Sequence, residues 1–219
     1  MNMKMKLKVG IDIVMVVLLF TAMAYPMLPR LHKGAGMAFF ALVVAHQLLN
    51  WQWWKGLFRG RFTKFRILQA AATVILLAAV LGVVGSGSMV HAHGPANALV
   101  QMKRSLAGVA HVSMAYWAFI FAGLHLGFNW NVMQGMLRRV MKPSHLRDEI
   151  SQTVVLGISV YGAYVFYDRY VYEYLLMLNQ RALFNIDDTP FAFAVDFFSM
   201  FVLFAFLGLR LAKWRALKS

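Results

Sequence analysis

Residues 32–51 read HKGAGMAFFALVVAHQLLNW, and residues 111–130 read HVSMAYWAFIFAGLHLGFNW. When the chain is aligned with itself so that His32 coincides with His111, both stretches show the pattern H-x13-H-x3-N-W, which continues as x4-G-x2-R. Each stretch is about 20 residues long and largely apolar, which is the length of a helix that crosses a membrane. Internal repeats of this parallel kind build many membrane bundles. The repeated helix is therefore the unit from which we derive the fold.

Further apolar stretches fill most of the remaining chain. Hydrophobic residues make up 61% and charged residues 14% of the 219 residues, which lies outside the composition of soluble globular proteins. The sequence predicts an all-α polytopic membrane protein with six transmembrane helices. We expect these spans at residues 9–28, 34–54, 67–89, 107–130, 151–172 and 192–212.

The repeat also divides the chain into three parts. Residues 1–62 are expected to form a first hairpin repeat, residues 63–142 a second, and residues 143–219 a C-terminal hairpin. The second helix of each repeat carries the histidines. Because equivalent helices of parallel repeats run in the same direction, we expect the two hairpins to form a four-helix bundle.

Lys and Arg residues indicate the orientation, because those in short loops are retained on the cytoplasmic side. Sixteen of the 22 lie before the first predicted span, after the second and the fourth, or at the C-terminus. The net charge of +14 thus sits in short clusters between apolar runs, and we expect no nucleic-acid partner. The pattern predicts a multi-pass protein of the cytoplasmic (inner) membrane with both termini in the cytoplasm. The start of the chain also resembles a cleavable signal peptide, but Asp12 inside the apolar run favours a retained span.

Two histidines mark each repeated helix. A separation of 14 residues places them about 21 Å apart along the helix and within about 40° of one another around it. Because the two helices are equivalent and parallel, His32 and His111 are expected at one depth near the outer face. His46 and His125 are expected together near the inner face. The sequence thus predicts two pairs of imidazoles, one in each half of the membrane.

The chemistry that suits these pairs is haem ligation. The chain has no cysteine, so iron–sulfur clusters, zinc thiolates and thioether-linked haem are excluded. A single tetrahedral zinc cannot use ligands that lie about 21 Å apart. A haem b needs two axial ligands and an apolar slot, without a covalent bond. We predict two bis-histidine haems b, an outer one with His32 and His111 and an inner one with His46 and His125.

Residues around these histidines are candidates for contact with the haems. Small residues allow a macrocycle to approach a helix closely, and seven glycines qualify. Arg30, Lys33, Lys103 and Arg104 break the charge bias on the outer side, where haem carboxylates would need cations. The glycines are Gly34, Gly36, Gly82, Gly85, Gly87, Gly123 and Gly127.

At the cytoplasmic edge, two further features are repeated. Asn50-Trp51 and Asn129-Trp130 are expected either to contact the inner haem or to form an interfacial aromatic belt. Arg59 and Arg138 either neutralise haem carboxylates or serve as topology signals.

The C-terminal hairpin lacks the histidine pattern. Tyr161 and Tyr164 belong to a tyrosine-rich stretch beside the acids of the last outer loop. This stretch is expected to be an interfacial belt, a docking surface for an outer redox partner, or a quinone pocket. Asp12 and Asp196 lie within predicted spans and are candidates for proton release.

The repeated pattern resembles the flavinylation-associated cytochrome family, formerly a domain of unknown function. It is also similar, less specifically, to the four-helix di-haem core of quinol-oxidising cytochromes b. The resemblance covers the two hairpin repeats and not the C-terminal hairpin. It implies electron transfer from the quinone pool or a membrane dehydrogenase to a flavoprotein outside the cytoplasmic membrane, with a quinone as a possible further cofactor. It rests on His32, His46, His111 and His125, with Trp51 and Trp130 behind them.

Other function classes remain open. The chain has no phosphate loop, nucleophile elbow or dinucleotide fingerprint, so we expect an electron-transfer subunit, such as a quinol-oxidoreductase component. The alternative is a small membrane transporter or metal-ion carrier that uses the histidines as ligands or proton relays. A haem-free scaffold with structural histidines is a third class.

Overall fold

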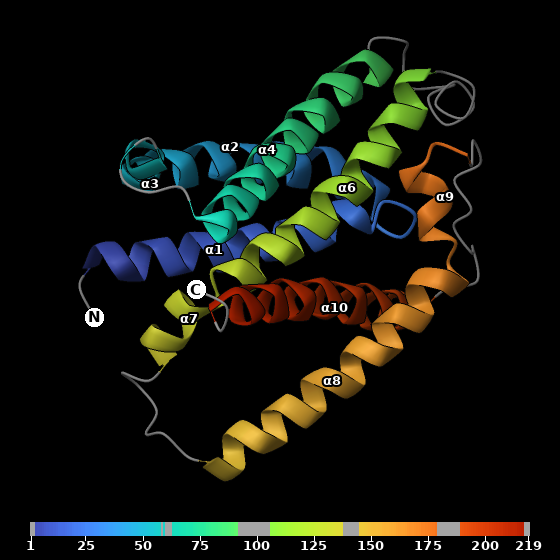
Figure 1. Cartoon of the computed structure of the whole chain (residues 1–219). Helices are drawn as coiled ribbons and strands as arrows, with labels where there is room; N and C mark the ends of the chain where they lie inside the picture. Colours follow the sequence, from blue (N-terminus) through green and yellow to red (C-terminus); the bar gives the residue numbers. More distant parts are fainter. Residues whose placement is uncertain are drawn as a thin grey trace. The chain divides into compact units, whose positions relative to one another are not determined.

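The fold is entirely helical in the part of the chain that the structure describes. A computed structural model describes residues 3–57, 59, 63–91, 106–137, 145–178 and 189–216 (Figure 1), and no strand occurs among them. This confirms the predicted all-α class. The chain forms two compact units, Met1–Phe62 with Leu183–Ala194 and Thr63–Ala182 with Val195–Ser219.

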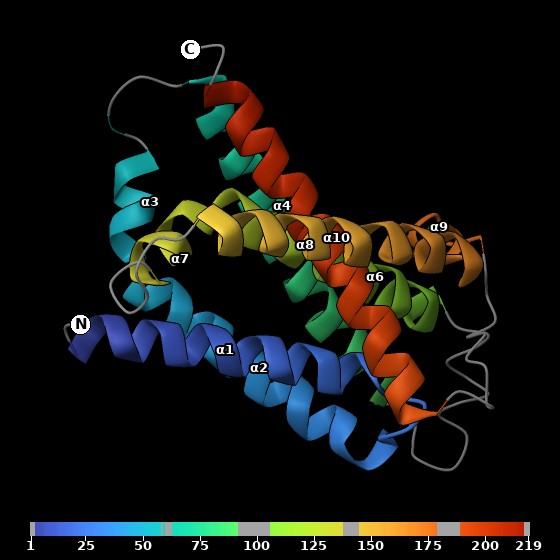
Figure 2. The same ribbon diagram turned by 90° about the horizontal axis from the view of Figure 1, so that it is seen from below.

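The first unit contains the first predicted hairpin. Helices α1 (Met3–Met23) and α2 (Pro29–Leu49) run antiparallel and pack against each other (Figures 1 and 2). Proline at the first position of α2 has its φ already set for a helix and loses no hydrogen bond there. The short connection between the helices therefore returns the chain directly along α1.

Both histidine-bearing helices end at an asparagine. Helix α2 ends before Asn50, and α3 (Trp51–Leu57) continues at an angle of 58°, so the predicted second span is bent. The Asn50 side chain donates to the carbonyl of His46 at 2.9 Å, in addition to the backbone N–H of Asn50, which donates to the same carbonyl at 3.0 Å. Asn129 does the same to the carbonyl of His125, at 2.8 Å. It separates α6 (Leu106–Phe128) from α7 (Trp130–Leu137).

The second unit contains the remaining helices. Helix α4 (Lys64–His91) packs against α6 along its length, in an arrangement like that of α1 and α2. Helix α8 (His145–Asp168) leads into the short α9 (Val171–Leu175), and α10 (Pro190–Ala216) follows. The predicted fifth span thus ends at Asp168 rather than at residue 172. Tyr170, with φ of 51°, turns the chain there.

Glycines bring α6 and α10 into close contact. A Cβ atom at Gly127 would collide with the backbone of Ala205 and Gly208, and one at Gly123 would meet Phe204 at 2.9 Å. Small residues at such positions let the backbones of membrane helices approach. The expectation that Gly123 and Gly127 face a haem is therefore wrong, because α10 occupies that side of α6.

The helices are long and apolar enough for a multi-pass membrane protein in a lipid bilayer. Among the described residues, α4, α6, α8 and α10 meet this requirement individually, and α2 meets it together with α3 as a bent pair. Helix α1 does not, since every stretch of it long enough to qualify contains Lys6, Lys8 and Asp12. Four to five of the six predicted spans are thus confirmed by length and composition.

Candidate functional site

The first hairpin holds its two histidines by their Nδ1 atoms. His32 donates from Nδ1 to the backbone oxygen of Ala22 at 2.8 Å, and His46 donates from Nδ1 to the Asp12 carboxylate at 2.7 Å. Both acceptors lie on α1. Both imidazoles are half-buried, so a polar partner is needed on the helix that covers them. Helix α1 therefore fixes the rotation of both rings.

The second hairpin repeats this arrangement with partners on α4. The Nδ1 atom of His111 lies 2.9 Å from the backbone oxygen of Val83, and that of His125 lies 3.1 Å from the hydroxyl of Thr73. The Thr73 hydroxyl gives its proton to the backbone oxygen of Gln69 at 2.8 Å. Since a hydroxyl has one proton to donate, Thr73 accepts the Nδ1–H of His125.

These four bonds select one tautomer. An acceptor at Nδ1 keeps the proton on that nitrogen, and in a neutral imidazole the lone pair is then on Nε2. Metal-bound histidines usually donate their second ring N–H to a carboxylate, a carbonyl or a similar acceptor, which orients the ring and raises its basicity. His32, His46, His111 and His125 therefore all have the hydrogen bonding that suits ligation through Nε2. In the structure, the side-chain N–H of Asn129 lies 3.5 Å from Nε2 of His125 and donates to this lone pair.

The hydrogen bonds reveal a second register of the repeat. The offset from Ala22 to its counterpart Val83 is smaller than the offset from His32 to His111, and the other partners on the preceding helices share this smaller offset. Tyr25 and Ser86 follow the same rule, since Tyr25 packs edge-on against His32 and the Ser86 hydroxyl lies 3.3 Å from His111 Nδ1. The matched bonds are Ala22–His32 and Val83–His111, Asp12–His46 and Thr73–His125, and Lys8–Asn50 and Gln69–Asn129.

The repeated asparagines also connect neighbouring helices. Lys8 donates to the side-chain oxygen of Asn50 at 2.9 Å, and Gln69 donates to that of Asn129 at 2.8 Å. Each asparagine thus links the end of its histidine-bearing helix to the preceding helix. The tryptophans that follow differ, because the side chain of Trp51 is 54% exposed and that of Trp130 is half-buried.

The predicted cationic surroundings are described in part. Arg30 and Lys33 are exposed on the first turn of α2, on either side of His32, and Arg59 is exposed beyond α3. Lys103, Arg104 and Arg138 lie outside the described residues.

The remaining candidate glycines lie in two kinds of surroundings. A Cβ atom at Gly34, Gly36 or Gly85 would meet nothing within 4 Å, so these positions leave space beside their helices. At Gly87 it would lie 3.0 Å from His111, and at Gly82 it would collide with Met114. Gly87 thus lets α4 approach an imidazole.

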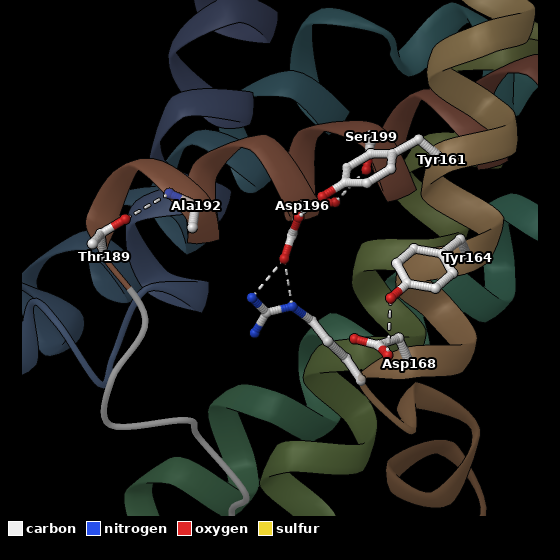
Figure 3. Close-up of polar contacts among 8 residues, drawn as sticks. Tyr161, Tyr164, Asp168, Thr189, Ala192, Asp196 and Ser199 are labelled. Atoms are coloured by element: carbon white, nitrogen blue, oxygen red, sulfur yellow. Dashed lines mark hydrogen bonds and ion pairs between the residues drawn. The ribbon is translucent and has the colours of Figure 1, made fainter.

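Asp196 belongs to a separate cluster in the second unit (Figure 3). Its carboxylate accepts two bonds from Arg169, at 2.8 and 2.6 Å, and a third from the Tyr161 hydroxyl at 2.7 Å. The nearby Tyr164 hydroxyl donates to Asp168 at 3.2 Å. The side chains of Arg169 and Asp196 are 20% and 13% exposed, which makes this ion pair a structural link between α10 and the end of α8. The sequence predicted Asp196 as a candidate residue but did not indicate its ion pair with Arg169.

Comparisons with protein-family models, curated proteins and solved structures give no match. The resemblance drawn from the histidine pattern therefore remains a hypothesis. Among the described residues, no three His, Asp or Glu side chains form a group that could hold a metal ion.

Proposed function

We propose that this chain is a b-type di-haem cytochrome that relays electrons across the cytoplasmic membrane. One observation carries the proposal. Each of the four repeated histidines gives its Nδ1–H to an acceptor on the preceding helix, which leaves the lone pair of the neutral ring on Nε2 in all four. A structural role would not require the same nitrogen to be bonded at four positions in two hairpins.

The donor set fits haem b. In the proposal, His32 and His111 ligate the outer haem, and His46 and His125 ligate the inner haem. The chain lacks cysteine, so the groups are held without a thioether bond. The iron supplies a one-electron couple between its ferric and ferrous states. Among the candidate glycines, Gly34, Gly36 and Gly85 have the open space that a macrocycle edge would need.

The proposal includes six spans with both termini in the cytoplasm. Helix α1 carries charged residues, which are uncommon in a span. Two of them are hydrogen-bonded, one to a residue of α2 and one to the asparagine that follows α2. Lys8 donates to Asn50, and Asp12 accepts from His46. Intramembrane ionisable groups are tolerated when they are bonded within the bundle in this way. Lys4 and Lys6 lie near the N-terminal end of α1, where long side chains reach the membrane interface.

The proposed partners come from the family resemblance. They are the quinone pool or a membrane dehydrogenase on one side, and a flavoprotein outside the membrane on the other. The exposed Arg30 and Lys33 are candidates for the carboxylates of the outer haem, and Arg59 for those of the inner haem.

A spectrum of the purified protein tests the proposal. We expect a b-type reduced-minus-oxidised difference spectrum, and two non-covalent haems per chain by pyridine haemochrome. His32→Leu and His111→Leu should each remove the same single haem, whereas His46→Leu and His125→Leu should each remove the other. His145→Leu, outside the repeat, should retain both.

Two outcomes would contradict the proposal at different levels. A folded, haem-supplied protein without a b-type spectrum would overturn the function and leave the transporter class as the leading alternative. Two haems in any of the four variants would overturn the ligand assignment.

A further inference from the structure

The inner histidines differ in the charge of the group that orients them. His46 donates to the carboxylate of Asp12, whereas His125 donates to the neutral hydroxyl of Thr73 at the matched position. The two outer histidines both donate to backbone carbonyls. Among the four matched bonds, one therefore has an anionic acceptor, and it belongs to the inner pair.

A carboxylate makes the imidazole that it holds a stronger donor to a metal. Hydrogen bonds to an ionised acceptor are shorter and stronger than those to a neutral one, which agrees with 2.7 Å at Asp12 against 3.1 Å at Thr73. A more basic Nε2 stabilises the ferric state relative to the ferrous state, because the ferric ion carries the greater charge. Hydrogen bonding to axial ligands is one of the levers by which proteins set haem potentials.

Two features limit the size of the effect. The Asp12 side chain is 41% exposed and the His46 side chain 24% exposed, so the carboxylate acts in a partly screened setting. Lys8, one turn before Asp12, brings a positive charge to the same helix and bonds to Asn50, one turn beyond His46. Its charge opposes that of Asp12. We therefore expect about a tenfold change in the reduction equilibrium.

We propose that Asp12 is a positioning residue that makes the inner site the low-potential site of the protein. The inference rests on the proposed di-haem function, and deepens it by giving the two sites different roles. At equilibrium, an electron on the protein then resides mainly on the outer site, which is the side of the proposed flavoprotein partner.

The duplication provides reciprocal variants for the test. Asp12→Thr copies the second hairpin, Asp12→Asn removes only the charge, and Thr73→Asp copies the first hairpin. Optical redox titration of the purified haem-loaded protein in lipid nanodiscs gives the two midpoint potentials. The couple that His46→Leu removes identifies the inner site. We expect both Asp12 variants to favour reduction of the inner site about tenfold, or about 59 mV for a one-electron couple. Thr73→Asp should shift it in the opposite direction.

The outer couple serves as the internal reference. Unchanged inner potentials in haem-loaded Asp12→Asn and Asp12→Thr would overturn the inference, as would equal shifts of both couples. If the Asp12 variants fail to retain haem, Thr73→Asp decides the matter, and an inner potential that does not fall overturns the inference. A parent protein without b-type haem would instead refute the proposed function, so the two failures are distinguishable.

Discussion

At each of the four histidines, hydrogen bonding at Nδ1 decides which ring nitrogen carries the proton. The acceptors are chemically unrelated, namely a backbone oxygen at Ala22 and Val83, a carboxylate at Asp12 and a hydroxyl at Thr73. What they share is an oxygen atom that accepts a hydrogen bond from the N–H group of the ring. The site is therefore defined by acceptor position rather than by residue type.

The Thr73 hydroxyl offers a test of this argument at one residue. Thr73→Val keeps the shape of the side chain but removes the acceptor of His125, so its ring loses the preference for the Nδ1–H tautomer. Outer-shell partners of this kind typically contribute about ten- to hundredfold in metal affinity. We expect Thr73→Val to lose the inner haem to apomyoglobin about ten times faster than the parent protein, while Thr73→Ser behaves like the parent. Equal transfer rates for all three proteins would show that the bond has no role in haem binding.

The four histidines could be singled out from the sequence, but the residues that accept their hydrogen bonds could not. Asp12 was visible as an acid inside an apolar run, yet its partner His46 lies far along the chain, on the next helix. Thr73 gave no signal, because a single threonine in an apolar helix is ordinary. Gly123 and Gly127 were misassigned because a glycine admits a cofactor and a neighbouring helix equally well.

Among the described helices, α6 and α10 are closely fitted to each other. Adding a methyl group to Gly127 forces it into the backbone of α10, and a backbone cannot move aside as a flexible side chain can.

This contact predicts unequal effects of the same substitution at two glycines. Gly127→Ala should destabilise the protein by about 1–3 kcal/mol through overpacking. Gly157→Ala, on the exposed face of α8 with nothing within 4 Å, should be neutral or slightly stabilising, because alanine favours the helix. Thermal unfolding in detergent measures both. Similar unfolding temperatures would contradict the close packing of α6 against α10.

The apolar runs predicted where helices occur, but not where they break. Asn50 and Asn129 follow the last residues of α2 and α6, where their side chains and backbone N–H groups both donate to the carbonyls of His46 and His125. Hydropathy does not register such local bonds. The predicted fifth span ran past the end of α8 for a similar reason, since the turn at Tyr170 interrupts a tyrosine-rich stretch that hydropathy alone does not divide.

At the scale of the molecule, duplication is the main organising feature. The match between the two histidine-bearing helices was readable because histidine, asparagine and tryptophan recur at fixed spacing. The match between α1 and α4 was not, because the corresponding positions share a bonding role without sharing residue identity. The matched pairs are Lys8 and Gln69, Asp12 and Thr73, and Ala22 and Val83.

The proposed topology can be tested directly, because the chain contains no cysteine. A membrane-impermeant maleimide should label Thr189→Cys in intact spheroplasts, since residue 189 precedes α10 on the proposed outer side. It should label Gln52→Cys, on the exposed surface of α3, only after the membrane is opened. Labelling of Gln52→Cys from outside would reverse the orientation.

The two registers of the repeat differ because the second hairpin has more residues between its matched positions: the connection is longer, and α4 continues further beyond Val83 than α1 does beyond Ala22. Helix α2 begins at Pro29, soon after α1 ends at Met23, whereas α6 begins at Leu106 and α4 ends at His91. Both hairpins nevertheless keep the same three bonds. The length of the connection therefore does not set the register, which the bonds themselves specify. For protein engineering, the feature to preserve when either hairpin is redesigned is therefore the set of bonded pairs between its two helices, not the number of residues that joins them.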